Sequence, residues 1–95
     1  MTNMIEYNIY GNGCKRMVTM SFDDGQKNDR RLCELLRKYG IKATFNLNML
    51  NEDNPWTVNY SEVKEVYATH EIAVHTQHHP WLEKMPPVSA INEIL

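Results

Sequence analysis

Residues 17–22, with the sequence Met-Val-Thr-Met-Ser-Phe, decide the fold class of this chain. The stretch is short and largely apolar, and an Asp-Asp-Gly turn signal follows it directly at residues 23–25. This combination predicts a strand that is buried on both faces, as in a parallel sheet. Residues 43–47 and 71–75 have a similar character, so we expect three short strands.

Helical spacing of apolar residues separates the first two strand candidates. Leu32, Leu35, Leu36 and Tyr39 recur at intervals that place them on one side of a helix. Two basic residues and then Gly40 come at the end of this pattern, which is typical of a helix C-terminus. We therefore predict a helix that ends near Gly40.

A second helix is expected between the second and third strands. Residues 48–57 are rich in Asn and contain a proline, which predicts an irregular loop before this helix. Asn59 can then cap the helix with Glu62 three residues later, and Val58 can pack against Val63 as a hydrophobic staple. The buried stripe would consist of Val63, Val66 and Tyr67.

Strands that alternate with helices predict an α/β protein with parallel strands and right-handed crossovers. After two prolines, an amphipathic helix begins at about residue 88, and its apolar stripe is still running at Leu95. Its apolar members are Val88, Ile91, Ile94 and Leu95. We therefore expect the chain to be the N-terminal part of a longer domain, and the two unpaired edges of a three-stranded sheet to favour self-association.

Composition excludes several classes of protein. With 95 residues, of which 42% are hydrophobic and 23% charged, the chain fits one soluble globular domain at most. A net charge of -2 argues against nucleic-acid binding, and no apolar run is long enough for a membrane span. The first 13 residues lack the features of a secretory signal, so a cytoplasmic location is the default expectation. Cys14 and Cys33 are expected to be free thiols.

Aspartate and histidine residues that could act in catalysis or bind a metal follow the first and third predicted strands. Asp23 and Asp24 come at the end of the first strand, while His75 and His79 come at the end of the third. The carboxyl ends of parallel strands form one face of such a fold, so the two groups should meet. Taken alone, Asp-Asp-Gly is ordinary turn chemistry, and a single histidine is usually a surface or core residue.

The presence of the aspartate pair and the histidine cluster in one short chain favours a metal site. All four histidines of the chain lie within residues 69–80, and one carboxylate with two imidazoles is a catalytic coordination set that leaves positions open. Two adjacent carboxylates are then useful, because one can complete the metal site while the other takes a proton from a water at the metal. The residues therefore indicate a metal-dependent hydrolase.

At these motifs the chain resembles the polysaccharide deacetylase family, also called the NodB-homology domain of carbohydrate esterases. Residues 21–25 match the Thr/Ser-Phe-Asp-Asp-Gly signature of this family, and residues 75–79 match its His-Ser/Thr-x-x-His signature. Residues 40–45 are similar to the family's second-strand stretch, and residues 70–72 with the later His79-Pro80 fit the flanks of the histidine motif. The resemblance covers about residues 17–82.

This resemblance implies a role for each matching residue. Asp23 would be the general base, while Asp24, His75 and His79 would bind one divalent metal ion. Thr76 would brace the histidine loop by hydrogen bonding. Zinc is the preferred ion, with cobalt, nickel or iron as alternatives.

The resemblance also implies a fold and a substrate. The fold would be a distorted (β/α) barrel, of which the chain supplies about three parallel strands with crossover helices. Residues 1–95 would then be an incomplete polysaccharide deacetylase domain, without the C-terminal half that carries the general acid, and of low activity by itself. The substrate would be an acetylated polysaccharide or oligosaccharide of the N-acetylglucosamine type, with Trp81 as a candidate sugar contact.

Two alternatives stay open at this point. The chain could be a metal-binding module or degenerate relative without catalytic turnover, or a plain α/β unit whose histidines bind nothing. His78 occupies a variable position of the motif and is expected to be a solvated residue at the rim.

Overall fold

A computed structural model of the chain describes residues 13–94. In chain order the elements are β1 (Ser21–Asp23), α1 (Asp29–Lys38), β2 (Thr44–Leu47), the 3-10 turn η1 (Tyr60–Glu62), α2 (Val63–Val66), β3 (Glu71–Val74), the 3-10 turn η2 (Leu82–Lys84) and α3 (Pro87–Ile94). The expectations for the first 12 residues and for Leu95 lie outside the described residues. Among the residues described, there is no helix whose length and apolar character would let it span a membrane.

The three strands form one parallel sheet in the order β1-β2-β3. Ser21 pairs with Thr44, and Thr44 pairs with Glu71, so the strands start nearly level. Parallel strands need long crossover connections, and the segments containing α1 and α2 supply them. This confirms the predicted α/β class with three parallel strands, whereas closure into a barrel stays a prediction.

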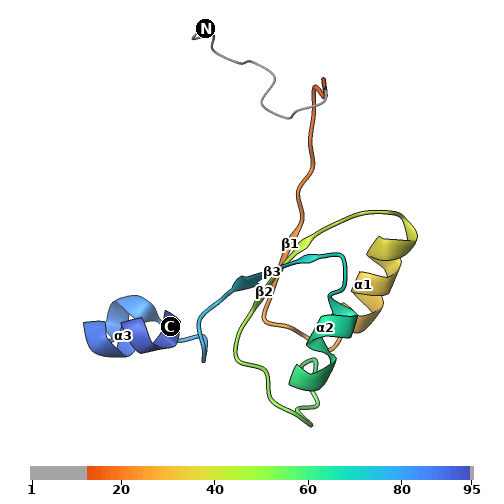
Figure 1. Cartoon of the computed structure of the whole chain (residues 1–95). Helices are drawn as coiled ribbons and strands as arrows, with labels where there is room; N and C mark the ends of the chain where they lie inside the picture. The colour runs from red at the N-terminus through yellow and green to blue at the C-terminus, as the bar shows by residue number, and fades with distance from the viewer. Residues whose placement is uncertain (1–12, 95) are drawn as a thin grey trace, which may run out of the picture.

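The core lies between the sheet and the two helices α1 and α2, which cover the same face of the sheet (Figure 1). Phe22 and Phe45 are register partners whose ring centroids are 5.4 Å apart, and Tyr67 packs against Phe45 at 4.9 Å. Cys33 and Leu36 contribute from α1. Strand side chains alternate between faces, so Ser21, Asp23 and Asn46 are left on the opposite, polar face.

The first strand is shorter and more exposed than predicted. β1 covers only Ser21–Asp23, and Val18, which was expected to be buried, is 81% exposed. β1 lies at an edge of the sheet, where β2 is its partner, and β2 begins at Thr44, opposite Ser21. Within the part of the chain that the structure describes, residues 17–19 therefore have no opposite strand to pair with. The prediction of a strand buried on both faces was wrong, because α1 and α2 cover one face of the sheet and Ser21 and Asp23 are exposed on the other.

The second helix also differs from the prediction. It begins as a 3-10 turn and continues as a single α-helical turn, and Asn59 makes no capping bond. Instead, Glu52 from the preceding loop accepts hydrogen bonds from the backbone N–H of Ser61 at 2.6 Å and from its hydroxyl at 2.9 Å. The Asn59 side chain is engaged by the backbone N–H of Asp53 at 3.0 Å. The predicted capping box is therefore replaced by a cap from the loop.

At α1 and α3, the residues that are exposed or buried differ from those that the sequence pattern predicts. Leu35 on α1 and Tyr39 just after it are exposed, while Asp29 is buried and accepts a hydrogen bond from the hydroxyl of Tyr67 at 2.7 Å. The predicted helix of the C-terminal segment is confirmed over the described residues as α3, which stands apart from α1 and α2 (Figure 1). Its apolar side chains Val88 and Ile91 are exposed.

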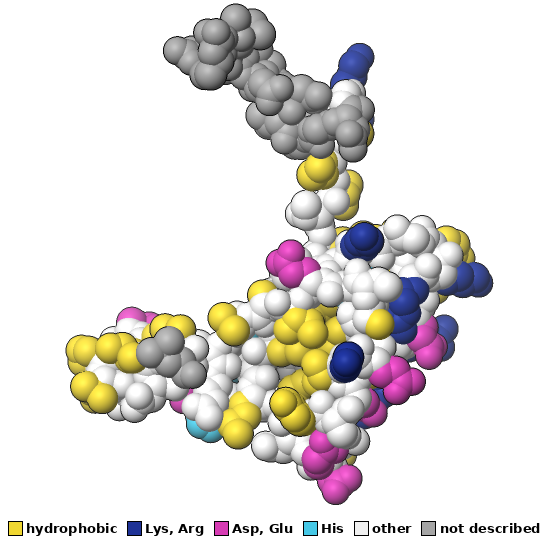
Figure 2. Space-filling view, viewed as in Figure 1, with side chains coloured by type: hydrophobic (Ala, Val, Ile, Leu, Met, Phe, Trp, Pro, Cys, Tyr) yellow, Lys and Arg dark blue, Asp and Glu magenta, His cyan; other side chains and the backbone are white. Residues whose placement is uncertain are grey.

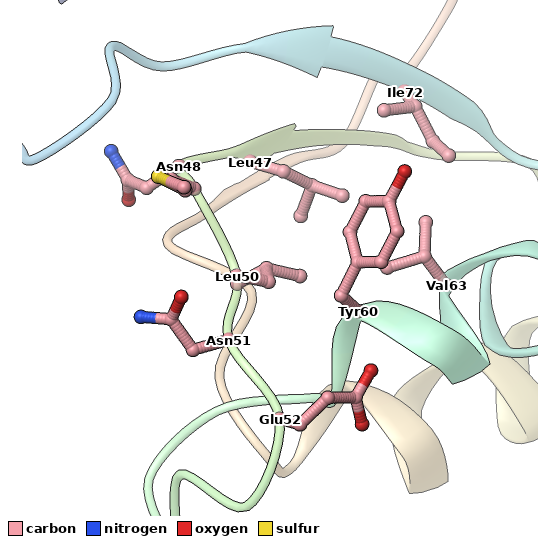
Figure 3. A pocket seen from close by; sticks show the side chains of 9 residues that line it. Leu47, Asn48, Leu50, Asn51, Glu52, Tyr60, Val63 and Ile72 are labelled. Carbon is pink, nitrogen blue, oxygen red and sulfur yellow. The ribbon is translucent and has the colours of Figure 1, made fainter.

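Apolar side chains also remain uncovered beside α2, in the middle of the view in Figure 2. There they line a hollow of about 540 Å³ (Figure 3), whose apolar walls are Leu47, Leu50, Tyr60, Val63 and Ile72. None of the described residues that line this hollow is a histidine or an aspartate. Both cysteines are free, and burial raises the pKa of the Cys33 thiol to about 11, which makes it a poor nucleophile.

Candidate metal centre

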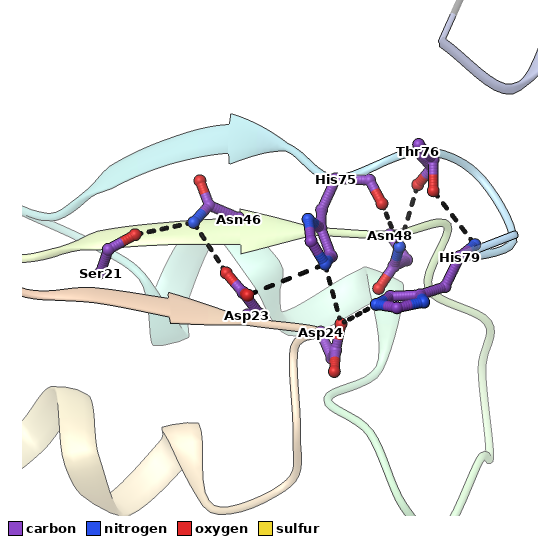
Figure 4. A network of polar contacts seen from close by, with 8 residues as sticks. All are labelled: Ser21, Asp23, Asp24, Asn46, Asn48, His75, Thr76 and His79. Carbon is purple, nitrogen blue, oxygen red and sulfur yellow. Dashed lines mark hydrogen bonds and ion pairs between the residues drawn. The ribbon is translucent and has the colours of Figure 1, made fainter. Parts of the chain in front are cut away.

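The ends of β1 and β3 bring one carboxylate and two imidazoles together (Figure 4). Asp24 directly follows β1, and His75 directly follows β3. The Oδ1 atom of Asp24 lies 3.3 Å from Nε2 of His75 and 3.5 Å from Nε2 of His79. One ligand atom from each of the three residues lies within 4.8 Å of the others, as a site for a single cation requires.

Two of these atoms are buried without a hydrogen-bond partner among the described residues. They are Oδ1 of Asp24 and Nε2 of His75, which face each other. Buried polar atoms are normally satisfied, so an unpaired oxygen and nitrogen in one place need an explanation. Oxygen and nitrogen ligands around tetrahedral zinc, with bonds of about 2.0–2.1 Å, lie roughly 3.3 Å apart. The donor set and its spacing therefore fit a divalent metal ion.

The backbone around the site is unusual. Asp24, Thr76 and His79 have positive φ angles of 78°, 63° and 58°, a region that residues other than glycine rarely adopt. Gly25 follows with φ 62°, and a Cβ atom there would come within 2.9 Å of the Leu50 side chain. Such conformations cost free energy and cluster at functional sites, so the surrounding structure must hold them in place.

Asp23 lies beside the three-residue cluster, with Oδ2 3.8 Å from Nε2 of His75. Its other oxygen, Oδ1, accepts a hydrogen bond from the side-chain amide of Asn46 at 2.9 Å. The same amide also donates to the hydroxyl of Ser21 at 2.8 Å. Asp23 is thus held on the polar face of the sheet with one oxygen directed toward His75 (Figure 4). The sequence reasoning did not identify Asn46, although its place in the middle of β2 next to β1 could have suggested it.

The histidine loop, residues 75–79, is fixed from within and from β2. The backbone N–H of His79 donates to the hydroxyl oxygen of Thr76 at 3.1 Å. The side-chain amide of Asn48, just after β2, donates to the backbone carbonyls of His75 and Thr76. Asn48 was also missed, because the sequence reasoning treated residues 48–57 only as a loop.

His78 does not join the cluster. Its side chain is exposed, as expected for a rim residue, but its Nδ1 lies 2.7 Å from Oε2 of Glu93 on α3. The other oxygen of Glu93 accepts a hydrogen bond from the backbone N–H of His78 at 2.6 Å. The hydrogen bond with the His78 side chain is the main reason why the pKa of Glu93 is lowered. No local motif signals Glu93, since it lies fifteen residues after His78.

The remaining candidate, Trp81, lies outside the cluster. A hollow of about 530 Å³ adjoins the site and is lined by His75, Thr76 and His79 among others, but Trp81 is not part of its wall. The Trp81 side chain is 69% exposed, with Nζ of Lys84 4.8 Å from its ring centroid. An exposed indole could stack on a sugar, so substrate contact at Trp81 stays a prediction.

Comparison with known proteins agrees with this geometry. The family model for polysaccharide deacetylases matches residues 10–95, which is nearly the whole chain. The chain belongs to the polysaccharide deacetylase family. No curated protein and no solved structure matches it.

Membership of the polysaccharide deacetylase family confirms the resemblance inferred from the two motifs. At the level of the family, the activity is that of a carbohydrate esterase that deacetylates polysaccharides, and such enzymes are generally metal-dependent. The three-residue cluster of Asp24, His75 and His79 provides a possible metal site in this chain. Which metal it takes, and what each residue does, belong to the proposal below.

Proposed function

We propose that the site at the ends of β1 and β3 serves the metal-dependent removal of acetyl groups from an acetylated sugar polymer of the N-acetylglucosamine type. The observation that carries the proposal is the convergence of Asp24, His75 and His79, two of whose ligand atoms are buried with no hydrogen-bond partner in residues 13–94. A divalent cation, with zinc preferred and cobalt, nickel or iron as alternatives, would satisfy these atoms.

The position of each residue at the site supports a specific role in the proposed reaction. Asp24, His75 and His79 would hold the cation, which when bound supplies a Lewis acid for acyl transfer. Asp23 is next to the cluster but is not one of its three members, so its free oxygen can accept a proton from an attacking water. Asn46 would keep the Asp23 carboxylate in this orientation, and Thr76 would keep the histidine loop closed.

The first experiment measures metal binding. The protein is stripped with a chelator and reloaded with Zn²⁺, and bound zinc is counted after equilibrium dialysis. We expect about one equivalent for the natural chain and a large loss for Asp24→Ala, because a three-ligand site is left with two imidazoles. Asp53→Asn is the matched control, since Asp53 lies in an exposed loop away from the cluster. Equal binding by Asp24→Ala and the natural chain would contradict the site.

The second experiment measures acetate release from N-acetylglucosamine oligosaccharides by the metal-loaded protein. Asp23→Asn should retain zinc but lower the rate by about 10²- to 10⁴-fold, as expected for loss of a general base. Full activity of Asp23→Asn would remove the assignment of Asp23. Because the chain by itself is expected to be of low activity, stoichiometric zinc without acetate release would favour a metal-binding module only if a protein extended to a complete domain also released no acetate.

A further inference from the structure

Among the described residues, the hydrogen bonds between helix α3 and the histidine loop all involve one residue near the end of the helix, Glu93. The Glu93 carboxylate accepts the backbone N–H of His78 with one oxygen and faces Nδ1 of His78 with the other. In addition, the backbone carbonyl of Glu93 accepts a hydrogen bond from the backbone N–H of Gln77 at 2.9 Å. Three polar contacts therefore join one residue of α3 to two successive residues of the loop.

These contacts are placed where the loop needs support. Thr76 and His79 both have positive φ angles, and Gln77 and His78 are the two residues between them. A loop with two such conformations would relax if nothing held its middle. The hydrogen bond from the His79 N–H to Thr76 and the hydrogen bonds from Asn48 fix the two ends of the loop. In the middle, Gln77 is also held by the backbone N–H of Met49, which donates to its carbonyl at 3.0 Å, whereas the hydrogen bonds of His78 within the described part of the chain all go to Glu93.

Glu93 also bears on which histidine faces the cluster. His78 and His79 are adjacent, and either imidazole could in principle reach a metal at the end of β3. The pairing of Nδ1 with Oε2 of Glu93 at 2.7 Å turns the His78 ring toward α3, while Nε2 of His79 lies 3.5 Å from Asp24. The side chain of His78 therefore contacts the helix, while that of His79 belongs to the cluster.

We propose that Glu93 is a positioning residue of the metal centre, which holds the histidine loop in its ligand-presenting form and keeps His78 out of the coordination set. The inference rests on the metal centre proposed above. It acts mainly through the backbone N–H of His78, because that hydrogen bond fixes the chain itself rather than one side chain. Supporting residues around metal ligands commonly change affinity by about 10- to 100-fold when removed.

The test compares zinc affinity, measured by competition with a chromophoric chelator, among four variants. Glu93→Ala should weaken binding by about 10-fold or more. Glu93→Gln should stay close to the natural chain, because its amide oxygen can still accept the His78 N–H. His78→Ala should also lose less affinity than Glu93→Ala, since the backbone bond remains. Glu65→Ala, an exposed residue on α2, is the matched control and should have no effect.

A second readout needs no metal. Amide hydrogen exchange in the metal-free protein should be faster at His78 in Glu93→Ala than in the natural chain, while the core amides of β2 stay unchanged. The variant should fold, because α3 contributes no residue to the buried cluster.

The outcomes separate the two proposals. A natural chain that binds no zinc overturns the metal centre and this inference with it. Tight zinc binding that Glu93→Ala leaves unchanged, or unaltered exchange at His78, overturns only the role of Glu93.

Discussion

At the scale of single residues, the hydrogen bond between Tyr67 and Asp29 joins two polar groups that are both buried. The Tyr67 hydroxyl donates to Oδ2 of Asp29 at 2.7 Å, and both side chains are buried. Tyr67→Phe would leave a buried carboxyl group without this partner. We predict a loss of about 1–3 kcal/mol in the free energy of unfolding at neutral pH, measured by urea denaturation.

The loss should depend on pH in a defined direction. Burial raises the pKa of Asp29 above 3.8, and the Tyr67 hydrogen bond partly opposes this. A raised folded pKa contributes stability that is fully present below the unfolded pKa and is lost as the pH rises through the folded pKa. Without Tyr67 the folded pKa of Asp29 rises further, so the penalty of Tyr67→Phe should shrink as the pH falls and Asp29 becomes protonated. Tyr39→Phe, at an exposed position just after α1, is the control. A penalty for Tyr67→Phe that does not change with pH would contradict the prediction.

The residues of the candidate site differ in how far the sequence could reveal them. Asp24, His75 and His79 could be proposed together because Asp24 and His75 directly follow strands of a parallel sheet and His79 lies in the loop after the third strand. The structure brings all three within reach of one cation. Asn48 and Glu93 could not be proposed from the sequence, since they contact the backbone of the histidine loop from the residue after β2 and from a later helix. Asn46 could be suggested only by its place in β2 next to β1. Contacts of this kind depend on register and helix placement, which no short motif encodes.

At the scale of elements, the sequence predicted whether a segment is a helix or a strand better than it predicted the residues at which each element begins and ends. The helix at residues 29–38 and the strands around Phe45 and Ile72 follow from local apolar patterns, although Leu36 is the only buried member of the predicted helical stripe. The first strand was predicted too long, because pairing with β2 sets its limits and that information lies elsewhere in the chain. The cap of the second helix was misassigned because Glu52, nine residues before Ser61, competes for the same backbone donor.

This cap leads to a prediction for η1 and α2. Glu52→Ala removes the acceptor for both the backbone N–H and the hydroxyl of Ser61. A lost N-terminal cap typically costs about 0.5–2 kcal/mol, and we expect a value at the lower end because the contact is exposed. Urea unfolding measures it, with the exposed Glu34→Ala on α1 as control. An Asn59→Ala variant that lost more stability than Glu52→Ala would restore the capping role to Asn59.

At the scale of the whole molecule, the described residues form a sheet with two open edges. β1 and β3 each pair with β2 on one side only. The helices α1 and α2 cover one face of the sheet, and apolar side chains such as Ile72 and Val74 remain exposed on the β3 side. An open strand edge with apolar neighbours is a template for pairing with another chain.

We therefore predict that the chain self-associates through the edge of β3 as its concentration rises, which sedimentation velocity can measure. Val74→Lys should shift the distribution toward monomer, because Val74 is 78% exposed at the end of β3 and a lysine on an edge strand opposes pairing. Val88→Lys is the matched control, since Val88 is 71% exposed on α3, away from the sheet. An equal shift by both variants would mean that apolar surface in general drives association, and a monomer at every concentration would mean that these edges are protected in solution. Only a shift confined to Val74→Lys supports pairing at the sheet edge, where backbone groups, rather than side chains alone, supply the contacts.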